Sequence, residues 1–416
     1  SATNGTITLA DVDNTFTGAV ALNTSGSSGN TTIKNDRALL LAASSVGGAF
    51  SATVSAGNIT QNGALDIEGA ITLVTTGVGA DIDLATNGTG NAFTSQLLIT
   101  TNETGSDKDA HTTIDGGTTN LILGNSTIDG NLTLLSGGTL TDTDGSTVTV
   151  QGTLTATTDA SASAITLNDL AVTGAFTLAP DGTGAVTIVN AVNLNLAAST
   201  MGGTFSGTAT QGDISDSGDL AITGAAKFIT TQAAQDIILD QAGNAFTSHV
   251  TMQAGNGDNA AFNDITFVDS TDVNLHSSAA SAGDLFIDAT NNLAVGGNLS
   301  ITATTGNITQ SGALDIEGTT TLVTLDQGAG IVLTTDTNAF TSKLLITTHD
   351  NDTPTDTTYA ADVSIDGGTT NLIIGNSTID GDLSLRSGGT ITDTNSSTVT
   401  VKGTLTAQTD ASNSVI

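Results

Sequence analysis

The sequence has no cysteine and no tryptophan, only 2 prolines, and 7 Lys+Arg against 41 Asp+Glu. The absence of cysteine excludes a disulfide framework and cysteine-ligated zinc. The formal net charge of −34 repels phosphate backbones, and the few basic residues form no patch, which excludes nucleic-acid binding. No stretch approaches roughly 18 consecutive apolar residues, and there is no basic amphipathic segment, so no membrane insertion is expected.

The composition that remains is typical of an ordered chain with a narrow interior. Of the 416 residues, 49 are glycine and 37% are hydrophobic, but only 3% are aromatic. Valine, isoleucine and leucine are spread evenly between threonine, serine, asparagine and glycine. Disordered acidic chains lack such residues, so apolar surface is available for burial along the whole length.

The chain repeats itself. The segment GNITQNGALDIEG from Gly57 returns as GNITQSGALDIEG from Gly306, and the long segment from Ile114 returns from Ile365, 251 residues later. A weaker copy, GDISDSGDLAITG, begins at Gly212, which lies 155 residues after Gly57 and 94 before Gly306. Both spacings are close to whole multiples of roughly 22 to 24 residues, which is the length of one solenoid coil.

Alternation with period two predicts short strands. It is plain in NLTL from Asn131, TVTV from Thr147 and TLTA from Thr153, where threonine suits an outward face and leucine or valine an inward one. No segment sustains a helical apolar period, and arrays of immunoglobulin-like sandwiches would need a repeat of about 100 residues and an aromatic core. We therefore predict an all-β, right-handed parallel β-helix, or β-solenoid, of roughly 20 to 25 residues per coil, without significant helix.

We expect one continuous β-solenoid over residues 1–416, with a shorter unit at about 8–165 and a longer one at 166–416 that holds an in-phase insertion. The final TDASNSVI matches TDASASAI, which ends at Ile165. Neither end shows the polar capping unit that closes a solenoid core. The sequence thus predicts an interior segment of a longer protein, or a subunit that stacks end to end.

Several motifs resemble the filamentous-haemagglutinin-like bacterial surface proteins, which are giant repetitive exoproteins and adhesins. The resemblance covers essentially the whole chain and rests on NTFTGAV at Asn14, on NAFTS at Asn91, Asn244 and Asn338, on GDIS-SG at Gly212, and on LAASxxGGxFS at Leu41 and Leu196. It implies a right-handed parallel β-helix, secretion to the cell surface, and a role as a stalk, fibre or adhesive filament.

The NAFTS motifs offer the first candidate site. Phe93, Phe246 and Phe340 stand at one repeat phase and could be sugar-stacking platforms. The alternative, which we favour, is that these rings fill the solenoid interior while the asparagine two residues earlier bonds to turn backbone.

Aspartates precede glycine at many places, where we expect turn and left-handed conformations at corners: Asp115–Gly116, Asp129–Gly130, Asp144–Gly145, Asp181–Gly182, Asp366–Gly367 and Asp380–Gly381. Two acidic clusters, Asp142–Asp144 and Asp350–Asp352, have oxygen-rich spacing but lack the glutamate of a calcium loop. No cofactor and no metal-binding residue is predicted, with calcium kept as an alternative.

The acids and histidines include residues that could form an enzymatic site. Asp66 with Glu68, repeated as Asp315 with Glu317, has the separation of a glycosidase carboxylate pair. Yet the Gly212 copy has alanine and threonine there, and identical catalytic sites along a rod are implausible. The four histidines are scattered, and His111 and His349 lie in polar loops. No catalytic residue is predicted, and the chain is expected not to be an enzyme.

The function expected from these observations is that of a structural repeat in a secreted bacterial cell-surface fibre, located outside the cell. Its expected partners are further copies or a continuation of the chain end to end, and a glycan or neighbouring cell. The main alternative is a glycan-binding adhesin that uses the loops at 102–111 and 349–359. A polysaccharide-degrading enzyme and an ice-binding solenoid are weaker alternatives.

Overall fold

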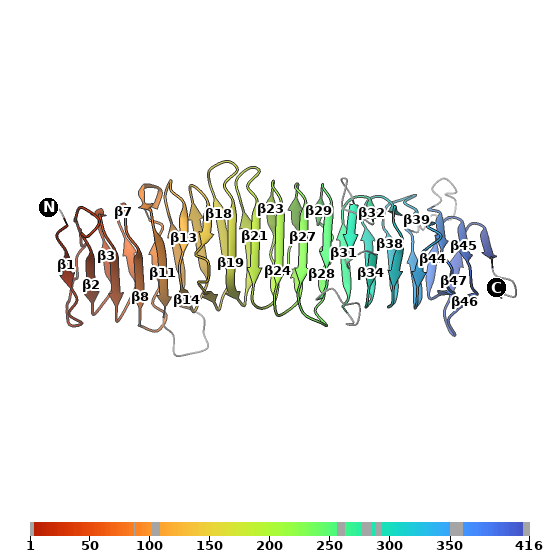
Figure 1. The fold of residues 1–416 in the computed structure, drawn as a ribbon, viewed down its shortest axis with the longest axis horizontal. Coiled ribbons are helices and arrows are strands. Elements are labelled where there is room, and N and C mark those ends of the chain that lie inside the picture. The colour runs from red at the N-terminus through yellow and green to blue at the C-terminus, as the bar shows by residue number, and fades with distance from the viewer. Residues whose placement is uncertain are drawn as a thin grey trace. The chain divides into compact units, whose positions relative to one another are not determined.

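The computed structural model describes residues 4–86, 88–101, 109–255, 263–276, 284–287, 293–349 and 361–410. They belong to two compact units, Ser1–Thr204 and Phe205–Ile416. Each unit is a parallel β-solenoid with about 22 residues per turn, in which the strands of one turn lie beside those of the next (Figure 1). The single helical element among the described residues is a 3-10 turn, η1 (Gly88–Gly90).

In the first unit, two long sheets and a short third one form the sides of the coil. One long sheet holds β1 (Ile7–Leu9), β2 (Thr31–Asn35), β5 (Phe50–Val54), β8 (Ile71–Thr75), β11 (Gln96–Thr101), β13 (Leu121–Leu123), β14 (Ser126–Ile128), β16 (Leu140–Asp142), β17 (Val148–Val150), β19 (Ile165–Val172) and β21 (Val186–Asn190). The other holds β3 (Leu39–Leu41), β6 (Ile59–Gln61), β9 (Ile82–Leu84), β12 (Thr112–Asp115), β15 (Leu132–Ser136), β18 (Leu154–Thr158), β20 (Ala175–Ala179) and β22 (Leu194–Leu196). The short sheet consists of β4 (Ser44–Val46), β7 (Leu65–Ile67) and β10 (Ala92–Phe93), and β23 (Ser199–Met201) ends the unit.

The second unit repeats this plan. One sheet holds β24 (Phe205–Ala209), β27 (Ala226–Thr230), β30 (Val250–Gln253), β32 (Val273–His276), β33 (Asp284–Ile287), β36 (Ile308–Gln310), β39 (Ile331–Leu333), β42 (Val363–Asp366), β45 (Leu383–Ser387) and β48 (Leu405–Thr409). A second holds β25 (Ile214–Asp216), β28 (Ile237–Leu239), β31 (Ile265–Asp269), β35 (Leu299–Ala303), β38 (Thr320–Thr324), β41 (Lys343–Thr347), β43 (Leu372–Ile374), β44 (Ser377–Ile379), β46 (Ile391–Asp393) and β47 (Val399–Val401). Short sheets consist of β26 (Leu220–Ile222) with β29 (Ala245–Phe246), and of β34 (Leu293–Val295), β37 (Leu314–Ile316) and β40 (Ala339–Phe340).

Each coil advances by about one strand width because its strands pair in parallel with the next coil. Phe50 pairs with Ile71, a step of 21 residues, and Ile59 pairs with Ile82, a step of 23. The predicted all-β parallel solenoid and its coil length are therefore confirmed. The prediction that one solenoid runs without a break from residue 1 to 416 stays a prediction.

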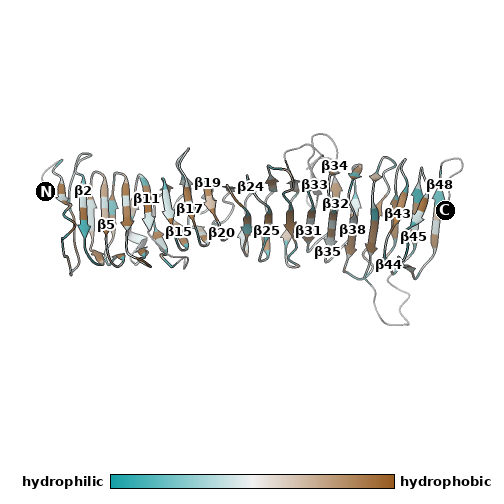
Figure 2. Cartoon of the chain, turned by 90° about the horizontal axis from the view of Figure 1, so that it is seen from below, coloured by the Kyte–Doolittle hydropathy of each residue, from teal (hydrophilic) through white to brown (hydrophobic). Residues whose placement is uncertain are grey.

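Alternation places the aliphatic residues inside. In β8, Ile71, Leu73 and Thr75 are buried while Thr72 and Val74 face outward, and Figure 2 shows hydrophobic and hydrophilic residues alternating along the strands. In-register pairing stacks the inward residues into columns. Each fully buried leucine or isoleucine contributes about 1.5 to 3 kcal/mol, so the columns supply most of the folding energy.

The regular coil is interrupted in both units. The strand β11 pairs with β13 through Leu97 and with β14 through Thr100, so two short strands of the next coil lie beside one long strand. The five-residue strand of that coil is β15, which belongs to the other long sheet. In the second unit, Ile265 pairs with Leu299, a step of 34 residues. This coil contains two strands of one long sheet, β32 and β33, where a regular coil contains one. The extra strand is a local insertion within a single coil.

Candidate functional site

The asparagine of each NAFTS motif lies buried at a corner, where it holds neighbouring coils together. Asn91 Oδ1 accepts a hydrogen bond from the Leu65 backbone N–H (2.8 Å), and Asn91 Nδ2 donates to the Asp115 carbonyl oxygen (2.8 Å). One side chain thus bonds to the coil before its own and to the coil after it. The predicted hydrogen bonding of this asparagine to backbone is confirmed.

The same arrangement recurs at Asn338, and at Asn244 the bond to the preceding coil recurs. Asn338 Oδ1 accepts from the Leu314 N–H (3.0 Å) and Asn338 Nδ2 donates to the Asp366 carbonyl (2.9 Å). Asn244 Oδ1 accepts from the Leu220 N–H (2.9 Å). These corners are therefore repeated structural elements.

The phenylalanines of the NAFTS motifs point into the core. Phe93, Phe246 and Phe340 are at most 2% exposed. In the second unit Phe246 also packs on the rings of Phe228 and Phe267, at centroid distances of 6.1 and 5.2 Å. A buried ring cannot stack on a sugar, so the sugar-platform reading is excluded and the interior reading is confirmed.

One corner of the first unit carries a ladder of side chains that the sequence analysis missed. Asn58 Oδ1 accepts from the Asp81 N–H (2.9 Å), Asp81 Oδ1 from the His111 N–H (2.7 Å), His111 Nδ1 from the Asn131 N–H (3.0 Å), and Asn131 Oδ1 from the Thr153 N–H (2.9 Å). Each acceptor takes a backbone N–H one coil further along, just before a strand. In the sequence, the ladder is visible only as an Asp, Asn or His just before one strand of each successive coil.

The second unit has an acidic ladder of the same kind. Asp213 Oδ1 accepts from the Asp236 N–H (2.9 Å), Asp236 Oδ1 from the Asp264 N–H (2.7 Å), and Asp264 Oδ1 from the Asn298 N–H (2.7 Å). Burial raises the pKa of Asp236. Many of the acids are thus structural acceptors between coils.

A shallow hollow beside this ladder has a volume of about 580 Å³. It is lined by two acids, Asp264 and Glu317, together with Gly296, Gly297, Asn298, Gly318 and Thr341. The Asp264 carboxylate is already bonded to Asn298 through both oxygens, at 2.7 and 3.1 Å. The part of the chain that the structure describes brings no three His, Cys, Asp or Glu side chains together as a metal site.

In the first candidate calcium cluster, Asp142–Asp144, the Asp142 carboxylate accepts hydrogen bonds from backbone N–H groups. Both Asp142 carboxylate oxygens accept from the Asn168 N–H, at 3.1 and 2.9 Å, and Oδ2 also accepts from the Asp169 N–H at 2.8 Å. Burial raises the pKa of Asp142. This carboxylate therefore clamps the next coil. The second candidate, Asp350–Asp352, lies outside the described residues.

The aspartate–glycine turns are explained only partly by left-handed backbone. Gly145 (φ 74°) and Gly182 (φ 58°) have left-handed backbone, but Gly116, Gly130, Gly367 and Gly381 are not among the glycines with positive φ. A Cβ on Gly130 would lie 2.4 Å from His111 Nδ1, and one on Gly381 would lie 2.3 Å from Asp362 Oδ1. At these two corners the backbone turns without a left-handed glycine, and glycine is needed for the close approach of successive coils.

The candidate catalytic pairs lie on outward faces. Asp66 and Glu68 are exposed, and in the second copy Asp315 is half-buried and Glu317 exposed. Of the polar-loop histidines, His111 is exposed but belongs to the ladder, and His349 is half-buried. The candidate adhesin loops lie mostly at 102–108 and 350–360, outside the described residues.

Some basic residues bond to acids of neighbouring coils. Arg386 lies 3.4 Å from Asp366 and 2.6 Å from Asp410, and Lys402 lies 3.0 Å from Asp380. Both basic side chains are about half exposed, so each pair contributes only about 0 to 1 kcal/mol.

Threonines form an outward column on one sheet of the first unit, where Thr113, Thr133, Thr155 and Thr177 pair in succession. In these four coils threonine therefore stands at one repeated outward position. In the preceding coil the residue that pairs with Thr113 is Asp83, so the threonine column begins at Thr113.

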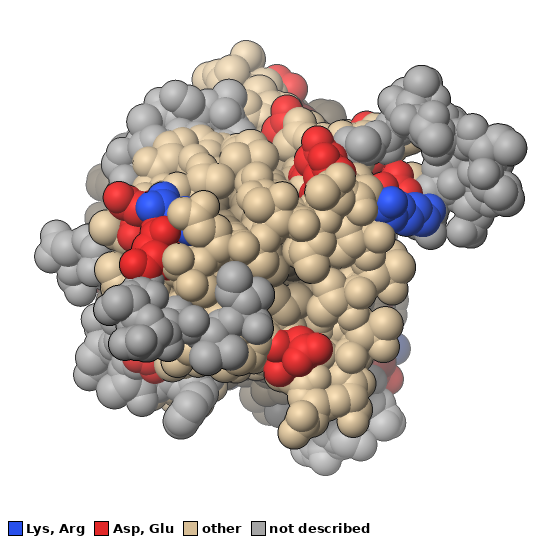
Figure 3. All heavy atoms as spheres, turned by 90° about the vertical axis from the view of Figure 1, so that its right-hand side faces the viewer, with Lys and Arg blue, Asp and Glu red and all other residues tan. Residues whose placement is uncertain are grey.

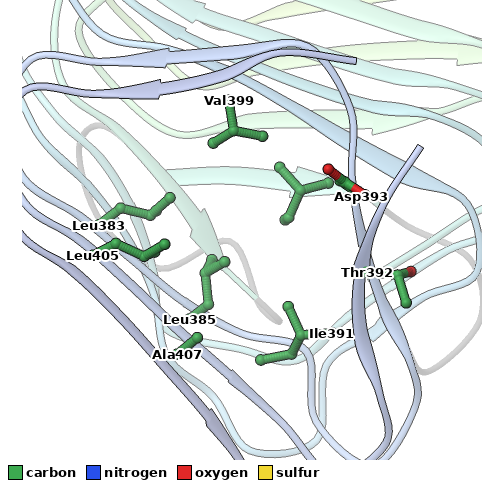
Figure 4. A pocket seen from close by; sticks show the side chains of 9 residues that line it. Leu383, Leu385, Ile391, Thr392, Asp393, Val399, Leu405 and Ala407 are labelled. Carbon is green, nitrogen blue, oxygen red and sulfur yellow. The ribbon is translucent and has the colours of Figure 1, made fainter. Parts of the chain in front are cut away.

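An apolar hollow lies at the last described coil of the second unit. It has a volume of about 460 Å³ and is lined by Ile374, Leu383, Leu385, Ile391, Thr392, Asp393, Val399, Leu405 and Ala407. Figure 4 shows these side chains around one space. Leu405 is 56% exposed, which is unusual for a residue on the inward side of a strand.

No helix in the described ranges is long and apolar enough to cross a membrane. No curated protein and no solved structure matches the chain.

Comparison with protein families gives five successive matches to one family model, described as repeats of unknown function (DUF5649). They cover residues 28–100, 109–180, 183–253, 263–347 and 360–416. The offset of 155 residues separates the first match from the third, and the offset of 251 separates the second from the fifth. The long repeats found by self-comparison therefore contain two or three of these shorter ones. Since the matches cover most of the sequence, the chain belongs to this family of repeats of unknown function (DUF5649).

Proposed function

We propose that this chain is a structural repeat segment of a secreted bacterial cell-surface fibre, with a mechanical role and no catalytic one. The observation that carries the proposal is the use of the corner side chains. In both units, buried asparagines and ladders of Asp, Asn and His bond one coil to the next. The side-chain oxygens and nitrogens of these residues, which a catalytic site would leave free to contact a substrate, here form hydrogen bonds that hold the coils in register.

The packing supports a stiff element. Successive coils pair in parallel and bury leucine, isoleucine and valine columns, so unfolding one coil exposes the apolar residues of its neighbours. Buried backbone is poorly accessible to proteases, and only 7 Lys+Arg offer sites for trypsin-like enzymes. Such a segment would maintain the spacing between functional parts of a long surface protein.

The negative charge supports a solenoid whose sheets do not associate laterally with those of other molecules. The net charge of −34 is distributed along the solenoid, and the outward strand positions are rich in threonine and serine. Like charges and polar faces oppose lateral pairing of sheets. Surface location itself rests on the motifs that resemble filamentous-haemagglutinin-like proteins, such as NAFTS at Asn91 and LAASSVGGAFS at Leu41.

Localisation and imaging test the proposal together. An antibody against the chain should label intact producing cells, and electron microscopy should show thin fibres on them. Labelling only after permeabilisation would contradict it. Deletion of 102–108 and 350–360 should leave the fibres in place; loss of glycan or cell attachment with intact fibres would show that those loops add adhesion to the mechanical role.

A further inference from the structure

One outward face carries the same residues in both units, although other positions of the same coils have changed. It lies on β5, β8, β11, β13 and β14 of the first unit and on β35, β38, β41, β43 and β44 of the second. Eight of its positions are identical in the two copies: Ser51, Thr53, Thr72, Val74, Leu98, Thr100, Ile122 and Thr127 correspond to Ser300, Thr302, Thr321, Val323, Leu345, Thr347, Ile373 and Thr378. We call this set the threonine–leucine face.

Strand pairing makes the face continuous within each unit. Thr72 pairs with Ser51 on one side and with Leu98 on the other, and in the second unit Thr321 has the corresponding partners. All residues of the face are half-buried or exposed. Their side chains therefore form columns along each unit, with about 4.8 Å between coils and about 7 Å between columns.

Repetition alone does not explain why this face is identical in the two copies. Inward residues of the same strands differ, since Phe50, Ala52 and Val54 of β5 correspond to Leu299, Ile301 and Ala303 of β35. Outward residues on the other long sheet of each unit differ as well, since Asp83, Thr113, Thr133 and Leu135 correspond to Val332, Ser364, Ser384 and Arg386. The threonine–leucine face has thus changed less than the core beneath it.

The weaker copy that begins the second unit shows that the fold accepts other residues at these positions. Lys227 pairs with Ser206, so it stands where Thr72 stands in the first unit. Thr251 pairs with Lys227, so it stands where Leu98 stands. Because the solenoid does not require these residues, a contact outside the chain is the better reason for their identity in the other two copies.

The face combines hydroxyl groups with low aliphatic side chains. Leu98 lies flat over the next coil, where a Cβ on Gly124 would lie 3.1 Å from Leu98 Cγ, and a Cβ on Gly375 would lie 3.4 Å from Leu345 Cγ. Threonine hydroxyls both donate and accept hydrogen bonds. A ligand with hydroxyl groups and apolar C–H surfaces would match both kinds of group.

The charge of the face favours an uncharged ligand. The face contains no acidic residue, although the chain has 41 Asp+Glu. Lysines stand at its margin, where Lys34 pairs with Thr53 and Lys343 pairs with Ile373. In Figure 3 charged side chains form separate groups with uncharged surface between them. The face therefore lacks acids that would hold a cationic ligand, and the net charge of −34 repels acidic polymers.

We propose that the threonine–leucine face binds an uncharged polysaccharide that lies along its columns. Sugar hydroxyls bond to the threonine side chains, while the C–H surfaces of the rings lie on Val74, Leu98 and Ile122 and on their counterparts in the second unit. The chain thus carries the same binding face twice. This inference goes beyond the mechanical role, because it adds a ligand and places glycan contact on a sheet instead of on loops.

Affinity electrophoresis of the full chain in native gels tests the proposal. Laminarin, dextran and galactomannan are the uncharged probes, and alginate is the acidic one. At least one of the uncharged polysaccharides should retard the chain in proportion to its concentration in the gel, and alginate should not.

The decisive variant is Leu98→Thr combined with Leu345→Thr. It should raise the apparent dissociation constant about tenfold or more, because it removes the central apolar contact from both faces. The weaker copy already has threonine at this position, as Thr251, so the fold should accept the change, and circular dichroism checks it. Leu135→Thr is the matched control, since Leu135 is also half-buried and outward but lies on the other long sheet, and it should leave retardation unchanged.

The proposal is overturned if none of the three uncharged polysaccharides retards the chain, if alginate retards it equally, or if the double variant is retarded as strongly as the unaltered chain. It is also overturned if analytical ultracentrifugation shows dimers that the double variant abolishes, since a second copy would then cover the face. The surface-labelling test of the fibre function does not depend on these results, so the failure of one proposal can be told from the failure of the other.

Discussion

The side-chain amides of Gln61 and Asn91 form a reciprocal pair inside a corner of the solenoid. Gln61 Nε2 donates to Asn91 Oδ1 at 3.0 Å, and Asn91 Nδ2 donates to Gln61 Oε1 at 3.1 Å. The pair recurs as Gln310 with Asn338, at 2.8 and 2.9 Å. In the third copy Asp216 takes the glutamine position and accepts from Asn244 Nδ2 at 2.6 Å. A buried polar group thus marks the same corner in three repeats.

Replacing Asn91 by alanine should destabilise the first unit strongly. The change removes the Asn91 bonds to Gln61 Oε1, the Leu65 N–H and the Asp115 carbonyl, which should lower the free energy of unfolding by roughly 2 to 4 kcal/mol. Urea denaturation followed by circular dichroism measures it. Asn62→Ala is the control, because Asn62 is exposed and its loss should change the free energy by under about 0.5 kcal/mol. Equal effects of the two substitutions would refute this account of the corner.

The phenylalanine stack should dominate the stability of the first coils of the second unit. Phe228 lies 5.2 Å from Phe205 and 6.1 Å from Phe246, measured between ring centroids. Phe228→Ala should therefore cost about 3 to 5 kcal/mol through lost contacts and a cavity. Phe228→Leu, which fills more of the space, should cost distinctly less. Thermal and urea unfolding measure both, and an alanine variant as stable as the leucine variant would contradict the packing argument.

Glycines that stack between coils should tolerate no side chain. A Cβ on Gly174 would lie 2.3 Å from the Gly152 carbonyl oxygen and 2.6 Å from its carbon, whereas a Cβ on Gly18 would meet nothing within 4 Å. Because backbone cannot move aside without separating the coils, Gly174→Ala should destabilise the first unit by about 1 to 3 kcal/mol. Gly18→Ala should be neutral or slightly stabilising. Comparison of their urea midpoints tests the difference.

Acidification should stabilise the protein between neutral pH and about pH 4. Burial raises the pKa of Asp269 from 3.8 to about 6, although the Phe246 N–H and the Thr271 hydroxyl donate to its carboxylate. A carboxyl whose pKa is higher in the folded state binds its proton more tightly there. Its contribution to stability is complete below the unfolded pKa and is lost as the pH rises through about 6.

Protonation of Asp269 raises the free energy of unfolding by up to about 3 kcal/mol, because its pKa rises from 3.8 to about 6 and each pH unit corresponds to about 1.36 kcal/mol. Burial raises the pKa of Asp216 and Asp142 as well, which adds in the same direction. Urea midpoints measured from pH 7 to pH 4 should therefore increase. Asp269→Asn should be more stable than the unaltered chain at pH 7 and should show a shallower pH dependence. A midpoint that falls on acidification would reject this sign.

Local pattern was sufficient to predict the fold class. The alternation in Leu132–Leu134 and Val148–Val150 predicts strands with one buried face, and the offsets between Gly57, Gly212 and Gly306 predict a step near the observed 22 residues per turn. The interior position of Phe93 was also predicted, because a scarce aromatic at a repeated phase fits a narrow core. These features depend on neighbours within a few residues or on repetition, and a single sequence displays both.

What joins one coil to the next could not be predicted in the same way. The ladder from Asn58 through Asp81 and His111, the close approach at Gly130, and the burial of Asp269 all depend on residues about 19 to 35 positions apart in the chain. Three different residue types serve as acceptors in one ladder, so no motif marks it.

The sequence by itself determined a repetitive, acidic, threonine-faced β-solenoid, because alternation and repetition are properties of the chain. Only the tertiary structure decided which acids are buried acceptors and which are surface charge, because that depends on the register between coils. It also decided where a coil end remains uncovered: Leu154 and Leu405 are the same residue type at the same phase, yet one is fully buried and the other is 56% exposed. The difference is the coil that packs against Leu154 and has no counterpart among the described residues at Leu405.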